Sequence, residues 1–232
     1  MSWAEDVVLR TGAAFHELAD PHRAAPMVAY MKHHFAFLGI PAPPRREAQR
    51  SAWRELSQPS PTDLTVAAQL LWRQPEREFH YAACDLLAKH NKICESNFLV
   101  ASVEPLLTSN SWWDSVDGLQ SAIVGPLLRR WPELKTVVRG WIGSENIWLV
   151  RSAITHQLGF RNHTDTALLF ELCSRRETDS EFFIAKAIGW ALRDYSYTNA
   201  ALVVGFVDSH PELQALSRRE AMKAINRRKL TG

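Results

Sequence analysis

Four short segments of similar character recur along the chain at a nearly constant spacing. The segments "FHYAACDLL", "WDSVDGLQS", "WLVRSAITH" and "FIAKAIGWA" begin at Phe79, Trp113, Trp148 and Phe183, so their aromatic anchors lie 34, 35 and 35 residues apart. A fixed period of this length is typical of stacked helical pairs, because each pair buries its apolar face only against its neighbours. The spacing therefore predicts an all-α chain, an α-solenoid of about six HEAT-like repeats with a concave groove.

Helix start and stop signals are frequent along the chain, whereas strand signals are nearly absent. Ser60 has the character of an N-cap before Pro61 at the first helical position, and Ser217 with Glu220 has the spacing of a capping box. Residues 27–39 have the pattern of an amphipathic helix that ends at a glycine. These segments, separated by short polar breaks, fit a series of helical pairs.

Composition narrows the class of protein. The 232 residues are 46% hydrophobic and 22% charged, which is ordinary for a soluble protein, and we expect one domain over residues 1–232. The first ten residues carry acids where a signal peptide is basic, and no apolar run is long enough to span a membrane.

Cys84, Cys94 and Cys173 form no C-x-x-C pair, which argues against a disulfide framework and a zinc site and fits a reducing cytoplasm. No P-loop, nucleophile elbow or zinc-protease motif is present, so we expect no metal and no cofactor.

Basic residues concentrate near the end of the chain, although the net charge of +2 gives no strong global field. Residues 211–232 carry six of them against two acidic residues: Arg218, Arg219, Lys223, Arg227, Arg228 and Lys229. Such a segment is most often a solvated helix face, and contact with phosphate is the alternative.

The repeat register places charges at equivalent positions of three successive repeats. Asp117, Arg151 and Lys186 follow one another at 34 and 35 residues. Alanines hold that place in the flanking repeats: Ala82 or Ala83 before, and Ala221 after. Each charge has a tryptophan close by on its own helix: Trp113, Trp148 and Trp190. A row of acidic, basic and indole side chains is unusual and indicates a functional face.

Each of these residues also has a structural interpretation. Most of the nine tryptophans must lie in the core, and the register aligns Trp113 with the apolar anchors Trp148 and Phe183. Asp117 and Arg151 could equally make an ordinary ion pair between repeats. Both interpretations stay open on these residues alone.

Several blocks of the sequence together resemble the AlkD family of DNA alkylation-repair glycosylases, which are built from HEAT-like repeats. The similar blocks are "MVAYMKHHFAFLGI", "PPRRE", "QPEREFHYAA", "SWWDSVD", "ENIWLVRSAITHQL" and "EFFIAKAIGWALRDYSYTN". They cover most of the chain, and the last three are specific.

The resemblance implies hydrolysis of the N-glycosidic bond of positively charged N3- or N7-alkylated purines, such as 3-methyladenine and 7-methylguanine, in double-stranded DNA. It implies catalytic roles for Trp113, Asp117, Arg151 and Trp190. Asp117 would stabilise an oxocarbenium-like sugar and orient water, the two indoles would lie against the deoxyribose, and Arg151 would hold a flanking phosphate. We expect a monomer in the cytoplasm, associated with the nucleoid in a bacterium.

Within "SWWDSVD", the four large side chains divide into two pairs. We expect Trp112 to pack between helices and Asp114 to support the helix start. Trp113 and Asp117 are four residues apart, which places them on one helical face.

We expect further contacts with DNA from five residues: Lys186 and Arg193 beside Trp190, and Tyr30, Arg45 and Arg46 in the N-terminal blocks. Tyr197 and Ala200 stand where members of the resembled family often have lysine and proline. The loss of that lysine predicts a weaker phosphate contact at the outer edge of the footprint.

Two other functions compete with a glycosylase. A non-catalytic solenoid would bind protein partners, and a lesion-binding protein would recognise damaged DNA without excising the base. None of the residues with an implied catalytic role is a lysine that could form a Schiff base, so a glycosylase of this kind would hydrolyse the bond without cleaving the strand.

Overall fold

The structure is a computed structural model that describes the backbone of residues 1–231 and the side chains of residues 1–227. The side chains of Arg228 and Lys229, two members of the basic C-terminal segment, lie outside the described residues. The chain forms two compact units, Met1–Leu106 and Leu107–Gly232. The expectation of one domain over residues 1–232 stays a prediction.

All regular elements of the described residues are helical, so the prediction of an all-α chain is confirmed. The first unit contains α1 (Trp3–His16), α2 (Pro21–Tyr30), α3 (Ala42–Ala52), α4 (Pro61–Trp72), α5 (Arg77–His90), the 3-10 turn η1 (Asn91–Ile93), the π-helical turn η2 (Leu99–Val103) and the start of α6 (Glu104–Leu107). The second contains α7 (Trp113–Leu119), the π-helical turn η3 (Gln120–Val124), α8 (Gly125–Arg130), η4 (Pro132–Leu134), α9 (Lys135–Trp141), α10 (Ile147–Thr155), η5 (Arg161–His163), α11 (Thr166–Ser174), α12 (Phe182–Ser196), α13 (Ala200–Ser209) and α14 (Ala215–Thr231).

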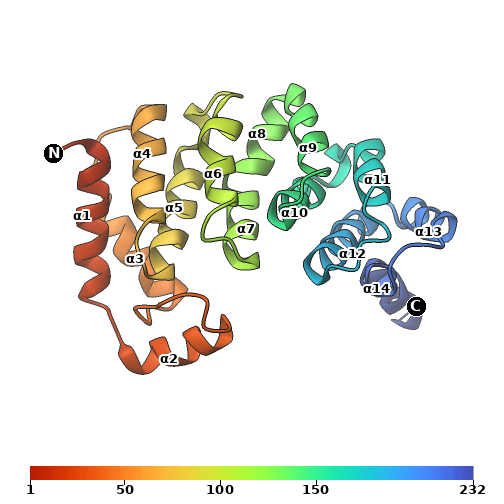
Figure 1. The fold of residues 1–232 in the computed structure, drawn as a ribbon, viewed down its shortest axis with the longest axis horizontal. Coiled ribbons are helices and arrows are strands. Elements are labelled where there is room, and N and C mark those ends of the chain that lie inside the picture. The colour runs from red at the N-terminus through yellow and green to blue at the C-terminus, as the bar shows by residue number, and fades with distance from the viewer. Residues whose placement is uncertain (232) are drawn as a thin grey trace. The chain divides into compact units, whose positions relative to one another are not determined.

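In the first unit, α1 packs against α3 and α4, and α4 packs against α5 (Figure 1). The rings of Phe15 and Phe79 meet in the core with centroids 5.3 Å apart. Trp53 donates its indole N–H to the hydroxyl of Thr11 at 2.9 Å, so this buried polar pair is satisfied. Ser60 caps α4 as expected.

The segment after α2 differs from the helix predicted over residues 27–39. The helix ends at Tyr30, because Lys32 and His33 adopt left-handed backbone conformations with φ of 55° and 61°. The returning chain is held by the buried carboxylate of Glu78, which accepts hydrogen bonds from the backbone N–H groups of residues 38, 39 and 40 at 2.9–3.0 Å. Gly39 has a φ of 87° there, and a Cβ would lie 2.1 Å from the carbonyl oxygen of residue 20.

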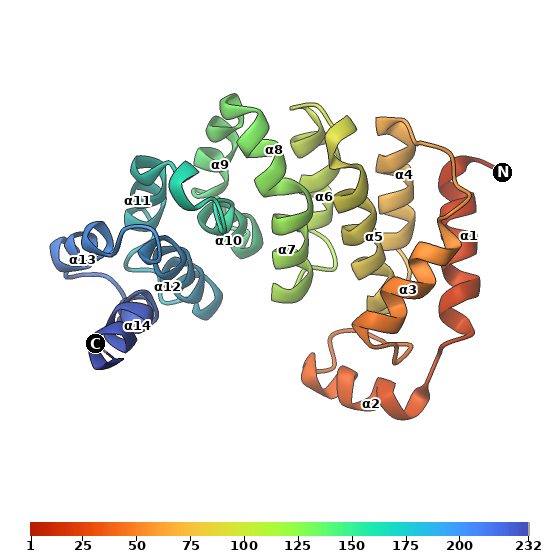
Figure 2. The ribbon, with the colours of Figure 1, turned by 180° about the vertical axis from the view of Figure 1, so that it is seen from behind.

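In the second unit, α7, α10, α12 and α14 pack in succession, each against the next (Figures 1 and 2). The N-terminal ends of α7, α10 and α12 share an aromatic cluster of Trp112, Trp148 and Phe183, whose ring centroids lie 5.0–5.7 Å apart. Trp112 therefore packs between helices, as expected. Asp114 lies in the first turn of α7, where its negative charge stabilises the N-terminus of the helix.

The contact between α12 and α14 is unusually close at Gly189. A Cβ on this residue would lie 2.5 Å from the Cβ of Glu220, so the glycine allows the two helices to approach. Ser217 donates its hydroxyl hydrogen to the carbonyl oxygen of Ala185 at 2.9 Å. Because α14 begins at Ala215, Ser217 lies inside the helix, and the predicted capping box of Ser217 with Glu220 is wrong.

Both π-helical turns precede a proline by two residues: η2 ends at Val103 before Pro105, and η3 ends at Val124 before Pro126. Proline lacks a backbone N–H and its ring crowds the carbonyl four residues earlier, so a wider turn lets the helix continue. Asp117 lies one turn before η3.

Candidate functional site

Asp117 and Arg151 form a two-pronged ion pair between α7 and α10. Arg151 donates from Nε to Oδ1 and from Nη2 to Oδ2 of Asp117, both at 2.8 Å. This parallel geometry matches the planar guanidinium to the planar carboxylate. The 34-residue spacing therefore corresponds to direct contact between neighbouring helices.

The same guanidinium reaches a third helix. Arg151 donates from Nη1 to the carbonyl oxygen of Phe183 in α12 at 2.9 Å. Its side chain is only 6% exposed, and three of its five N–H groups are used inside the protein. The geometry therefore favours a positioning role for Arg151, and the contact of this residue with phosphate stays a prediction.

The Asp117 carboxylate is the more accessible partner, with 20% of its side chain exposed. Burial raises the pKa of Asp117, the hydrogen bonds and charge of Arg151 oppose that rise, and the charge of Asp114 adds to it; the net pKa lies above the ordinary value. A raised pKa makes this carboxylate a stronger base than an ordinary aspartate. Each oxygen keeps a lone pair beyond its bond to Arg151, so the group can also accept a proton or orient water.

Two tryptophans lie close to this pair in the fold. The guanidinium carbon of Arg151 is 5.8 Å from the ring centroid of Trp190, which is within the range of a cation–π contact. Trp113 lies one helical turn before Asp117 and is half-buried, as Trp190 is. The structural interpretation of Trp113 as a fully buried core residue does not hold, since Trp113 is half-buried, and so are the anchors Trp148 and Phe183.

Lys186 and Arg193 share one acidic partner on α14. Glu220 lies 3.1 Å from Lys186 Nζ and 2.5 Å from Arg193 Nη1. The two basic side chains are 38% and 27% exposed, so both can also reach solvent. The sequence pattern suggested Glu220 only as part of a capping box and not as the partner of Lys186, although it lies 34 residues after Lys186, one repeat further on.

The three candidates in the first unit have different environments. Arg45 is 3% exposed and pairs with Asp85 at 2.9 Å, so its burial does not favour contact with DNA. Arg46 is exposed and lies 3.8 Å from the same carboxylate. Tyr30 is 69% exposed and, with Arg45, lines an apolar cavity of about 360 Å³.

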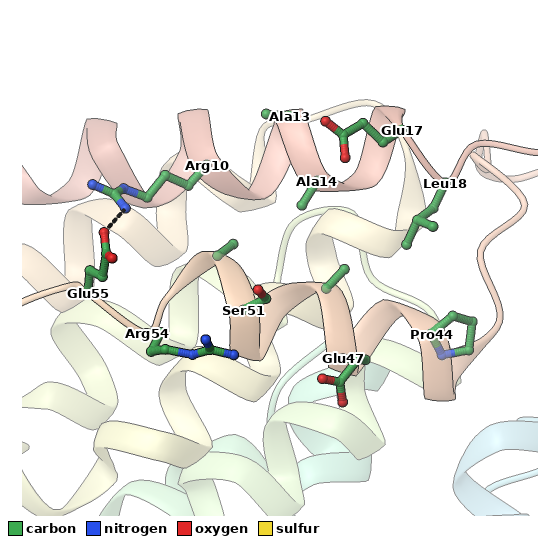
Figure 3. A pocket seen from close by; sticks show the side chains of 12 residues that line it. Arg10, Ala13, Ala14, Glu17, Leu18, Pro44, Glu47, Ser51, Arg54 and Glu55 are labelled. Atoms are coloured by element: carbon green, nitrogen blue, oxygen red, sulfur yellow. Dashed lines mark ion pairs between the residues drawn. The ribbon is translucent and has the colours of Figure 1, made fainter.

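Another cavity, of about 730 Å³, lies between α1 and α3 (Figure 3). Its walls are small residues such as Ala14 and Ala48, and charges of both signs surround it, including Arg10 paired with Glu55 at 3.7 Å. None of the candidate residues lines this cavity. It therefore has no connection with the chemistry that the sequence predicts.

Two further expectations concern metals and membranes. Across the part of the chain that the structure describes, no three His, Cys, Asp or Glu side chains converge in a way that could hold a metal ion. Among the same residues, no helix combines the length and apolar character needed to cross a bilayer.

Comparison with known proteins places the chain in a family. The sequence profile of the DNA alkylation repair enzymes matches residues 11–225. The chain belongs to the DNA alkylation repair enzyme family. A solved structure described as "Predicted DNA alkylation repair enzyme from Enterococcus faecalis" is 35% identical, with a TM-score of 0.82 over 88% of this chain and 95% of that chain. No curated protein matches the sequence.

Membership of the DNA alkylation repair enzyme family assigns the chain to enzymes that repair alkylation damage in DNA. It also confirms the predicted fold class, an all-α chain of α-solenoid type. The number of repeats and the concave groove stay predictions.

Proposed function

We propose that this repair enzyme is a monofunctional DNA glycosylase that removes positively charged N3- and N7-alkylated purines from double-stranded DNA. The observation that carries the proposal is the Asp117 carboxylate, which Arg151 fixes from its buried side while part of it stays open to solvent. The likeness to a DNA alkylation repair enzyme supports the choice of substrate.

The chemistry suits an electrostatic catalyst. An alkylated purine carries positive charge, and breaking its bond to C1′ returns the electron pair to the base and neutralises it. Positive charge then develops on the deoxyribose, where a fixed carboxylate stabilises it. Asp117 is proposed to supply that charge.

Water completes the reaction. Its oxygen forms the new bond to C1′, and its proton passes to Asp117 or to solvent. The raised pKa of Asp117 supports the role of proton acceptor, because a more basic carboxylate takes a proton more readily. No cofactor enters this scheme.

The tryptophans and Arg151 would assist in different ways. The electron-rich faces of Trp113 and Trp190 favour a cationic sugar, at about 0.5–2 kcal/mol each. Arg151 holds Asp117 in one orientation, so no reorganisation of the carboxylate is needed as charge develops. Lys186, Arg193 and Arg46 are proposed to contact phosphates, which position the duplex without reading its sequence.

A release assay tests the proposal. The protein is incubated with duplex DNA treated with a methylating agent, and free 3-methyladenine and 7-methylguanine are measured by mass spectrometry. Release of either base, with an abasic site left in an intact strand, is the expected result. Binding of the DNA without release would instead identify a lesion-binding protein, and absence of both would leave a protein-binding scaffold. The monomeric state and the location in the cytoplasm stay predictions.

A further inference from the structure

Glu220 lies beneath a small basic surface formed by α12 and α14. We call the side chains Lys186, Arg193 and Lys223, with Glu220 below them, the α12–α14 basic patch. Glu220 is 10% exposed, which is less than the 38% and 27% of the two residues it contacts, Lys186 and Arg193. Lys223 is exposed on α14, and its charge acts on the same carboxylate.

Close packing of α14 against α12 fixes the position of the Glu220 Cβ. The absence of a side chain at Gly189 brings α14 against α12 at this point, and the Ser217 hydroxyl bonds to the carbonyl oxygen of Ala185 one turn away. Lys186 and Arg193 are seven residues apart, so they lie two turns apart on the helix face that meets Glu220. This packing keeps the carboxylate of Glu220 within reach of both basic side chains.

The electrostatic consequence follows from the signs of the charges. Burial raises the pKa of Glu220, but the hydrogen bond and charge of Lys186, with the charges of Lys223 and Arg193, bring the pKa below its ordinary value. The carboxylate is therefore ionised at neutral pH. It cancels one of the three positive charges and repels an incoming phosphate.

We propose that Glu220 is an affinity-limiting residue for the DNA backbone. The basic patch binds phosphate through Lys186 and Arg193, and Glu220 weakens this binding so that undamaged duplex is released. The proposal rests on the proposed function in one respect, that DNA is the ligand of this face. An enzyme that searches for rare lesions must leave undamaged DNA, and phosphate contacts are the part of the interface that does not distinguish the two.

The variant Glu220→Gln tests the proposal. It keeps the shape of the side chain but removes the charge, and one of the two accepting oxygens becomes an amide nitrogen, which only donates. The probe is a fluorescent undamaged duplex, titrated at several salt concentrations between 50 and 200 mM. We expect affinity to rise by roughly threefold to tenfold at the low-salt end, and the slope of log affinity against log salt to steepen by about 0.9.

A matched control separates a local effect from a change in net charge. Glu171 pairs with Arg139 at 2.8 Å between α11 and α9, so Glu171→Gln releases one basic side chain and changes the net charge equally. We expect this variant to keep the wild-type salt slope. Equal steepening in both variants would overturn the proposal, as would an unchanged slope or weaker binding in Glu220→Gln.

A second variant keeps the proposal testable if Glu220→Gln does not fold. Lys186 is 38% exposed, so Lys186→Gln removes little buried structure. We expect its salt slope to become shallower by about 0.9, because one phosphate contact is lost. An unchanged slope would show that the patch does not touch DNA. These binding measurements use undamaged duplex and need no excision. They therefore test the role of Glu220 independently of the proposed release of methylated bases.

Discussion

The guanidinium of Arg151 and the carboxylate of Asp117 meet in two parallel hydrogen bonds of 2.8 Å, although the residues are 34 positions apart in the sequence. The pair is asymmetric, because the side chain of Arg151 is almost completely buried and that of Asp117 is partly exposed. This asymmetry directs the carboxylate outward and the guanidinium inward. It separates the group proposed to act on the substrate from the group that positions it.

Asp117→Asn is expected to slow base release by about 100-fold or more, because one preorganised charge is lost. Single-turnover release from methylated duplex, at saturating protein, measures the effect, and DNA binding should persist. Asp114→Asn is the matched control, since it removes the same charge from the first turn of the same helix. Near wild-type release by Asp117→Asn would exclude its catalytic role.

Arg151→Gln is expected to move the acidic limb of the pH–rate profile to higher pH. Release requires ionised Asp117, so the rate falls as pH drops through the pKa of this group. The bonds and charge of Arg151 lower that pKa, and their removal raises it further. We also expect a loss of about 3 kcal/mol in the free energy of unfolding, because a buried partner is removed.

The same variant addresses the phosphate contact expected for Arg151. A residue that binds phosphate in the complex would leave a shallower salt dependence of DNA affinity when it is removed. An unchanged slope together with a shifted acidic limb would leave only the positioning role.

Trp190→Leu is expected to lower the single-turnover rate by an amount equivalent to about 0.5–2 kcal/mol, since leucine is apolar but has no ring face for a cationic sugar. Affinity for undamaged duplex should change little. A variant that loses affinity but keeps its rate would place Trp190 in binding and not in catalysis.

We expect the buried His156 to make the free energy of unfolding depend on pH. Burial lowers the pKa of His156 to about 4, while an unfolded histidine titrates near 6.5, so the unfolded chain binds more protons between these values. The free energy of unfolding should therefore fall by about 3 kcal/mol as pH drops from about 6.5 to 4 and lose nothing further from this group below that. Urea unfolding at several pH values measures the slope, and His156→Gln should flatten it.

Gly189→Ala is expected to destabilise the protein by about 1–3 kcal/mol, because the new Cβ would lie 2.5 Å from the Cβ of Glu220. Gly205 in α13 provides the control, since a Cβ there meets nothing within 4 Å. Gly205→Ala should be neutral or stabilising by about 0.5–1 kcal/mol. Urea unfolding of both variants compares the two, and equal stability would show that α12 and α14 can separate at low cost.

The features that follow the repeat period were the most predictable from sequence. Asp117 and Arg151 occupy equivalent positions of neighbouring repeats, and equivalent positions lie side by side when helices stack. The same register places Glu220 one repeat after Lys186, so the ion pair between these two residues was also predictable. Ser60 was recognisable as a cap because its hydrogen bonds are local.

Features that depend on distant partners were not predictable in the same way. The end of α2 at Tyr30 reflects a turn held in part by Glu78, which lies about forty residues further on. Arg45 resembles its exposed neighbour Arg46 in sequence, and only the packing against Asp85 distinguishes their burial. Local patterns carry no information about such contacts.

The π-helical turn η3 restricts the number of residues between α7 and α8, and not only the identity of those residues. Such a turn holds one residue more than an α-helical turn, and each residue of an α-helix rotates the chain by about 100°. Deleting one residue from an ordinary α-helical turn would rotate the flanking segments by about that angle. Deleting one from Gln120–Val124 would instead close the wide turn to α geometry with little net rotation, but it would bring the ring of Pro126 against a backbone carbonyl and destabilise the helix. Single-residue deletions here should therefore be selected against even where every individual side chain can be exchanged.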